Sequence, residues 1–293
     1  MPPGAPYGGR RPGLGEQAAA TLERVQQRLS RWVLVVAAAL VASVAATAVA
    51  GAASTPAVAV DRYVALGDSF SSGVGTGSYT LSSSCRRSVH AYPYLVAQQR
   101  PNTSLAFVAC SGATTSDVLA KQVQAVDAST TIATITVGGN DIGFADLIYR
   151  CTLGACGAAL DSTRNSLERV LGPRLDTVYA TVKSRAAFGA KLIVLGYPRI
   201  FGTGGCLGTF GVTATERVKA NQLATALDRT LATHATAAGL TYRSFTGSFA
   251  THPVCSTSAW LNGLNPFDIT ESYHPNRSGN ALGYLPAVRA ITG

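Results

Sequence analysis

Two residues far apart in the sequence have the types and settings that nucleophilic acyl transfer requires. Ser69 follows a short β-branched run in Gly67-Asp68-Ser69, where a strand-to-helix turn would expose its hydroxyl group. His274 is followed by a proline, which restricts its backbone, and it precedes a predicted helix. A histidine can remove the proton of a serine hydroxyl and so make it a nucleophile. The alternative for Ser69 is an ordinary helix N-cap, and its fragment alone does not separate the two interpretations.

Two glycine-containing fragments could supply hydrogen-bond donors to the oxyanion of an acyl-transfer transition state. Asn140 closes the most apolar predicted strand, in Gly138-Gly139-Asn140-Asp141, and its side-chain amide is a donor. Gly112 follows another predicted strand, in Cys110-Ser111-Gly112-Ala113, and its backbone N–H is a second candidate. Each fragment also has a simpler interpretation. The first is a common glycine-rich turn, and the second is a loop anchored by a disulfide.

The segments around these fragments alternate short β-branched runs with longer helical patterns. Such alternation predicts a parallel sheet covered by helices on both faces. In sheets of this kind, functional sites form beyond the carboxyl ends of the strands, which is where the candidate residues lie. We predict strands at 62–66, 104–109, 131–137, 191–195 and 240–243. We predict helices at about 91–100, 115–126, 161–187 and 213–238, with N-caps at Asp161 and Thr213, and a final helix after 275–279.

In type and in order, four fragments resemble the SGNH (GDSL-like) hydrolases: Gly67-Asp68-Ser69, Gly112, Gly139-Asn140-Asp141 and His274. The resemblance covers essentially all of 61–293. It implies a flavodoxin-like, three-layer α/β/α fold with a parallel sheet of about five strands. It also implies that Ser69 attacks an acyl carbonyl with His274 as base, and that no cofactor or metal is required. The oxyanion hole would be formed by the amides of Ser69 and Gly112 and the side chain of Asn140.

This chain departs from the family pattern at two positions. Phe70 replaces the usual leucine after the serine, which is a tolerable change at a packing position. Glu271 stands three residues before the histidine, where the family usually has an aspartate. The resemblance therefore implies that either the Glu271 side chain or a backbone carbonyl orients His274, as a carbonyl does in some secreted relatives. We favour the resulting Ser–His dyad, with Glu271 contributing through its carbonyl oxygen or not at all.

The six cysteines all follow residue 60, and an even count indicates three disulfides if the chain is exported, as the segment before residue 60 predicts. No C-x-x-C pair is present, so the cysteines do not indicate a metal site. Six cysteines can pair in many ways, and we predict the sequential arrangement. The pattern resembles secreted actinobacterial lipases and esterases of the SGNH family. The predicted pairs are Cys85–Cys110, Cys151–Cys156 and Cys206–Cys255.

The first sixty residues differ in composition from the rest of the chain. Residues 1–15 are rich in Pro, Gly and Arg, and we predict that they are disordered. Residues 32–60 contain no charged residue and follow three arginines in 24–31. A basic segment, an apolar stretch and small residues in A-x-A order together predict a cleaved export signal. The alternative is an uncleaved membrane anchor with the catalytic domain outside the cell, and in both cases 61–293 is the hydrolase domain.

The chain carries a formal net charge of +9, but its basic residues are scattered and have no aromatic–basic motif. Nucleic-acid binding is therefore not expected, whereas transient contact with lipid surfaces is. We predict a secreted, monomeric serine esterase or lipase that acts on small-molecule or lipid esters. The alternatives are a carbohydrate O-deacetylase on the same fold and a surface-binding protein that has lost activity.

Overall fold

The structure of the chain is a computed structural model that describes Gln26 and residues 60–293. The disordered start and the export or anchor segment predicted within residues 1–60 therefore lie outside the described residues. Among the helices that are described, none is both long and apolar enough to cross a bilayer.

Within the described part of the chain, five strands form one parallel sheet in the order β2-β1-β3-β4-β5. This is the strand order of flavodoxin-like folds, so the predicted fold class is confirmed. Every residue of β3 is buried, because helices cover both faces of the sheet. The strands are β1 (Asp61–Gly67), β2 (Thr103–Phe107), β3 (Ile132–Thr136), β4 (Lys191–Leu195) and β5 (Thr241–Arg243).

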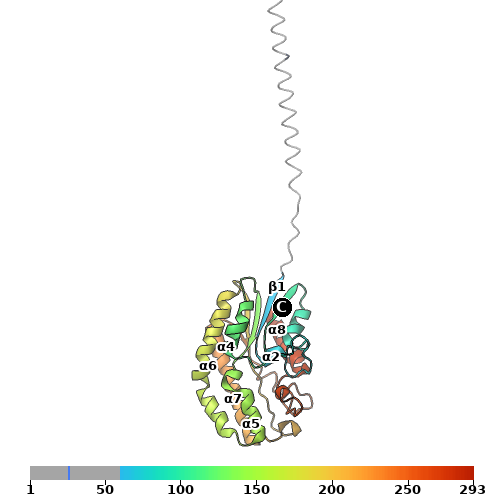
Figure 1. Ribbon diagram of the computed structural model, residues 1–293, viewed down its shortest axis with the longest axis vertical. Helices are drawn as coiled ribbons and strands as arrows, with labels where there is room; N and C mark the ends of the chain where they lie inside the picture. The colour runs from blue at the N-terminus through green and yellow to red at the C-terminus, as the bar shows by residue number, and fades with distance from the viewer. Residues whose placement is uncertain (1–25, 27–59) are drawn as a thin grey trace, which may run out of the picture. The chain divides into compact units, whose positions relative to one another are not determined.

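Helices flank the sheet on both sides (Figure 1). On one side α6 packs along α7, and on the other α3 packs against α8. The carboxyl ends of β1, β2 and β3 lie at the same end of the sheet, and each leads into a candidate fragment. The helices are α2 (Ser69–Ser72), α3 (Tyr92–Gln98), α4 (Thr115–Asp117), α5 (Phe144–Leu153), α6 (Gly157–Arg185), α7 (Ala214–Ala237) and α8 (Leu285–Thr292).

The predicted elements differ from the structure at three places. Thr213 caps α7 as predicted, but α6 already begins at Gly157, so Asp161 lies inside this helix and pairs with Lys219 of α7. The helix predicted over 115–126 divides into α4, a π-helical turn and a 3₁₀ turn. The sequence pattern did not predict α5, which is short and lies between Gly143 and Gly154.

All six cysteines lie in the described range and form three disulfides with the sequential pairing. Cys85–Cys110 joins the loop after α2 to the loop after β2. Cys151–Cys156 joins the end of α5 to the start of α6, and Cys206–Cys255 joins the loops that follow β4 and β5. Each disulfide therefore holds a connection at the carboxyl-end edge of the sheet.

The three disulfides should differ in their contribution to stability. A cross-link lowers the entropy of the unfolded chain more when it closes a longer loop. Replacing both cysteines of Cys206–Cys255, which are 49 residues apart, should lower the free energy of unfolding by about 4 kcal/mol. The same change at Cys151–Cys156, 5 residues apart, should cost about 2 kcal/mol. Urea unfolding of the two double Cys→Ser variants tests this order, which the opposite ranking would contradict.

Candidate active site

The chain turns sharply between β1 and α2, and this turn presents Ser69. Gly67 has φ +127°, and a Cβ atom there would lie 2.4 Å from the carbonyl oxygen of Thr136 in β3. Only glycine therefore fits at the end of β1. Asp68 caps α2, because its Oδ1 accepts a hydrogen bond from the N–H of Phe70 at 2.9 Å. Ser69 is thus both the first residue of a helix and a residue beyond the carboxyl end of a central strand.

A buried polar network lies beneath Ser69 and joins the ends of three strands. The hydroxyl group of Tyr197, after β4, donates to Oδ2 of Asp68, after β1. The same hydroxyl accepts from the N–H of Gly139, after β3, at 3.1 Å. Burial raises the pKa of Asp68 to about 7, although the hydrogen bonds from Tyr197 and Phe70 oppose this rise. The network fixes the loops that carry Ser69 and Asn140 relative to each other.

Ser69 and His274 contact each other directly. Oγ of Ser69 lies 2.7 Å from Nε2 of His274, and each residue is only 7% exposed. Nδ1 of His274 lies 3.0 Å from the backbone carbonyl oxygen of Ser272. A carbonyl can only accept, so Nδ1 carries the proton and Nε2 is free to accept from the serine hydroxyl.

Burial also sets the charge of His274. It lowers the pKa of the imidazole to about 4, against the opposing effect of the hydrogen bond to Ser272 and with a further lowering by the charge of Arg86. The imidazole is therefore neutral at neutral pH. A neutral imidazole with a free Nε2 is the form that can act as a base.

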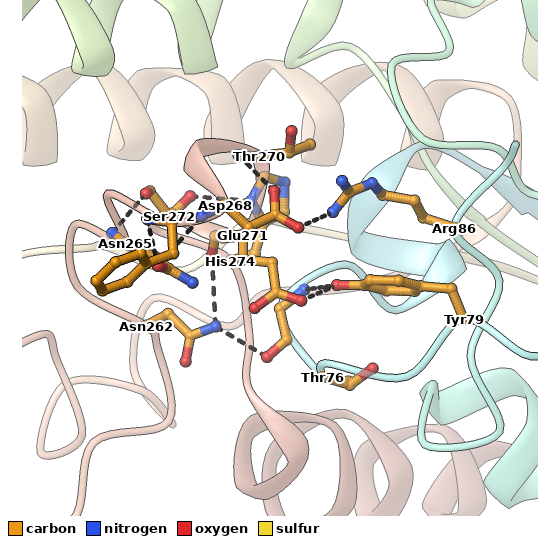
Figure 2. Close-up of polar contacts among 12 residues, drawn as sticks. Thr76, Tyr79, Arg86, Asn262, Asn265, Asp268, Thr270, Glu271, Ser272 and His274 are labelled. Atoms are coloured by element: carbon orange, nitrogen blue, oxygen red, sulfur yellow. Dashed lines mark hydrogen bonds and ion pairs between the residues drawn. The ribbon is translucent and has the colours of Figure 1, made fainter. Parts of the chain in front are cut away.

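The position of Glu271 separates the alternatives that the sequence left open for the group that orients His274. Its carboxylate accepts a hydrogen bond from the hydroxyl group of Tyr79, and its own carbonyl accepts from the N–H of His274 at 3.4 Å (Figure 2). The carbonyl at Nδ1 of His274 belongs to Ser272, one residue later in the chain. Glu271 therefore orients the imidazole directly through neither its side chain nor its carbonyl oxygen.

Three hydrogen-bond donors lie in the same pocket as the Ser69 hydroxyl. The N–H groups of Ser69 and Gly112 have no hydrogen-bond acceptor among residues 60–293, and Gly112 adopts φ +80°. The side-chain amide of Asn140 donates to the carbonyl oxygen of Ala113 at 3.0 Å. Because an amide nitrogen carries two hydrogens, the second remains for another acceptor. The three residues anticipated from sequence as oxyanion donors thus line one pocket.

Asp141 braces the loop that carries Asn140. Its carboxylate accepts hydrogen bonds from the N–H of Thr115 at 2.9 Å and from the Thr115 hydroxyl, and it pairs with Arg174 at 3.2 Å. Its side chain is fully buried. A carboxylate held by these three groups is fixed as part of the scaffold and does not face the imidazole of His274.

A cavity of about 240 Å³ opens over Ser69. One wall is α5, and the other is the loop that leads to His274. The cavity can therefore hold an apolar group beside the serine hydroxyl and the three donors. Its apolar lining comes from Phe70, Phe144, Ile148, Tyr149, Ile269 and Tyr273.

The sequence did not single out Tyr197 or Gln122. Tyr197 follows β4, and its role depends on a contact with Asp68, which is distant in sequence. Gln122 lies in the π-helical turn, where its amide accepts from the N–H of Gly67 at 2.8 Å and donates to the Gly67 carbonyl at 3.0 Å. No local pattern in the sequence signals either contact.

The remaining clusters of ionisable residues have structural partners. His234 of α7 bridges Asp176 and Glu168 of α6 through its two ring nitrogens, so its contacts join the two helices. Cys151, Cys156 and Glu216 lie close enough together to suggest a metal site among the described residues. The two cysteines are joined to each other, however, so neither offers a thiolate ligand.

Comparison with known proteins places this geometry in a family. The model of the GDSL-like Lipase/Acylhydrolase family matches residues 65–282. A lipase from Streptomyces rimosus is 41% identical over 245 residues, which cover 82% of this chain and 90% of that protein. The crystal structure of an extracellular lipase from Streptomyces rimosus aligns with a TM-score of 0.75 at 40% identity, covering 79% of this chain and all of the other.

A second solved structure is equally similar. The phospholipase A1 from Streptomyces albidoflavus NA297 aligns with a TM-score of 0.75 at 41% identity, covering 80% of this chain and all of the other. The family match spans the segment from β1 to the turn before α8, which includes Ser69, Gly112, Asn140 and His274. The chain belongs to the GDSL-like lipase/acylhydrolase family.

Proposed function

We propose that this protein hydrolyses fatty-acyl esters through an acyl intermediate on Ser69. The observation that carries the proposal is the 2.7 Å contact between the Ser69 hydroxyl and a neutral, buried His274. His274 takes the hydroxyl proton as Oγ attacks the ester carbonyl, and the N–H groups of Ser69 and Gly112 and the Asn140 amide stabilise the oxyanion. The imidazolium then protonates the departing alcohol. Water, activated by the same imidazole, releases the acid.

His274 acts here without a side-chain carboxylate. The carbonyl oxygen of Ser272 holds the Nδ1 proton, and so it fixes both the tautomer and the direction of the ring. A carbonyl dipole stabilises the imidazolium less than a carboxylate charge would. We therefore expect a Ser–His dyad in which the low pKa of His274 keeps the base neutral.

The surroundings of the pocket favour lipid substrates. Tyr149 and Ile269 line the cavity and are also exposed at its mouth. Neighbouring loops present further apolar side chains, of which Phe267 is 98% and Leu207 88% exposed. These loops are contiguous, because the N–H of Leu264 donates to the carbonyl of Gly208. Exposed apolar side chains around a pocket mouth favour contact with a lipid surface. Tyr149 and Ile269 line the pocket, and Leu153 at the end of α5 and Leu207, Phe210 and Phe267 in the loops are further exposed apolar side chains.

We also propose that the protein is exported and active as a monomer. Three disulfides are typical of an oxidising compartment, and one relative is an extracellular lipase. Residues 1–60 would direct or anchor the chain and 61–293 would form the hydrolase domain, as the composition suggests. Ser69, Gly112, Asn140 and His274 come from a single chain, so hydrolysis requires no second copy.

Single substitutions should remove activity in a graded order. Ser69→Ala and His274→Ala should each lower kcat by at least about 10⁴-fold, because each removes a group that reacts. Asn140→Ala removes one oxyanion donor and should lower kcat by about 10²- to 10³-fold. Initial rates on p-nitrophenyl butyrate measure this, with Ser166→Ala in α6 as the control. Turnover that survives in Ser69→Ala would rule out the acyl-serine route.

The apolar cavity predicts a preference for longer acyl chains. Each methylene that it buries is worth about 0.8 kcal/mol, or about fourfold in kcat/KM. In a p-nitrophenyl ester series from acetate to palmitate, kcat/KM should rise from acetate to medium or long chains. Activity on acetate alone would favour the O-deacetylase alternative. Absence of activity in folded, oxidised protein would favour the inert surface-binding protein.

The acid limb of the pH profile should reflect His274. The imidazole must be neutral to accept the serine proton, and its pKa is lowered from 6.5 to about 4. As the pH falls, kcat/KM should therefore persist below 6.5 and decline only near 4. Initial rates between pH 3 and pH 9 measure the limb, with folding checked by circular dichroism. A midpoint near 7 would instead implicate Asp68, whose pKa is raised to about 7.

A further inference from the structure

The turn that aims the Ser272 carbonyl at His274 is conformationally strained. Tyr273, between these two residues, has φ +62°, a left-handed conformation that is unfavourable for a residue with a side chain. Tyr273 is buried, and its ring packs against Phe201 with centroids 5.4 Å apart. A strained conformation persists only where the surrounding structure holds it. The contacts that hold this turn therefore bear directly on the direction of the imidazole.

The strand-like segment around Asn262 holds the turn on one side. The carbonyl oxygen of Asn262 accepts from the N–H of Tyr273 at 3.1 Å, and its N–H donates to the carbonyl of His274 at 2.9 Å. The side-chain amide of Asn262 donates to the carbonyls of Gly75 at 2.8 Å and Glu271 at 3.4 Å. Asn262 thereby links the turn to the loop that follows the helix of Ser69 (Figure 2).

That loop holds the turn on the other side, and its contacts centre on Tyr79. The Tyr79 hydroxyl accepts from the N–H of Gly75 at 3.1 Å and donates to the carboxylate of Glu271. Gly75 packs so closely that a Cβ atom there would lie 2.7 Å from the carbonyl of Pro275 and 3.0 Å from Cβ of His274. Figure 2 shows Tyr79 reaching Glu271 from the facing loop.

A second contact, between Arg86 and Asp268, joins the same two segments as the hydrogen bond between Tyr79 and Glu271. Arg86 pairs with Asp268 at 2.7 Å, and its guanidinium lies 5.0 Å from the centre of the Tyr79 ring. Arg86 has φ +48°, and its neighbour Cys85 is bonded to Cys110, two residues before Gly112. The Tyr79–Glu271 and Arg86–Asp268 contacts therefore connect the turn at Tyr273 to the loop that follows α2. This loop continues from the helix of Ser69 and is joined by the disulfide to the segment of Gly112.

We propose that Glu271 is a positioning residue for His274, acting through its hydrogen bond with Tyr79. This hydrogen bond keeps the strained turn closed. The Ser272 carbonyl therefore stays directed at Nδ1 of His274, and Nε2 stays directed at the Ser69 hydroxyl. Glu271 touches neither the imidazole nor the substrate pocket, so its effect is on orientation and not on chemistry. The proposal rests on the acyl-serine function proposed above.

Four single variants of the full chain, together with the Glu271→Ala/Tyr79→Phe double variant, separate this role from general stabilisation. Glu271→Ala and Tyr79→Phe each remove the hydrogen bond between the two side chains. Glu271→Gln keeps an acceptor for the Tyr79 hydroxyl without the charge, and Tyr242→Phe is the matched control. Tyr242 also donates to a carboxylate, that of Asp228, but it does so between β5 and α7. The measurements are kcat and KM on p-nitrophenyl butyrate, together with the melting temperature.

Glu271→Ala and Tyr79→Phe should each lower kcat by about 10- to 100-fold with KM unchanged, because a small misplacement of a catalytic group is costly. The double variant should show no larger decrease in kcat than either single variant, because both changes break the same hydrogen bond. Glu271→Gln should retain most of kcat. Tyr242→Phe should lower the melting temperature at unchanged kcat.

Three outcomes would overturn the positioning role. They are unchanged kcat in folded Glu271→Ala, additive losses in the double variant, and a loss in Glu271→Gln as large as that in Glu271→Ala. If Glu271→Ala does not fold, Tyr79→Phe decides by the same criteria. Ser69→Ala is assayed in parallel. If it stays active, the acyl-serine function fails, whereas an inactive Ser69→Ala beside a fully active Glu271→Ala removes the positioning role alone.

Discussion

A hydrogen bond between Ser69 and His274 joins residues that are 205 positions apart and is the contact on which the site depends. It needs the sharp exit from β1 at Gly67 and a closed turn at Tyr273, and both are unfavourable for an ordinary chain. Hydrogen bonds offset the first cost, because Gln122 bonds both backbone groups of Gly67 and Asp68 caps α2. Loop-to-loop contacts through Asn262 and Tyr79 offset the second. The site is therefore a product of the whole fold.

Burial has opposite consequences for the two ionisable groups nearest the nucleophile. It lowers the pKa of His274 and raises that of Asp68, because a low-dielectric surrounding disfavours either charge. His274 consequently remains a neutral base. Asp68 retains its place because Tyr197 and the α2 backbone donate to it. The same desolvation thus keeps His274 in the form that can act as a base, whereas at Asp68 it is a cost that hydrogen bonds must offset.

Sequence patterns anticipated those parts of the fold that depend on local periodicity. The five strands, α6 and α7 were found because apolar periodicity is a local signal, whereas the fragments around Ser69, Asn140 and His274 were found because their type and order resemble the SGNH hydrolases. The break in the helix over 115–126 was missed because Gln122 is drawn to Gly67, a contact of tertiary origin. Ser272 was missed for a related reason. Its carbonyl acts through the conformation of Tyr273, and residue type does not report a positive φ.

An orienting group that belongs to the main chain changes which positions are open to variation. Every amino acid supplies a carbonyl oxygen, so no substitution at Ser272 can delete the acceptor of the Nδ1 proton. At Ser272, selection therefore acts on the backbone conformation and not on the identity of an acidic side chain. Sequence drift would therefore be restricted at positions that keep the turn closed, such as the glycine at 75, where a side chain would strike Pro275 and His274. A search for a third catalytic side chain would overlook this constraint, because it lies in the backbone conformation of the turn.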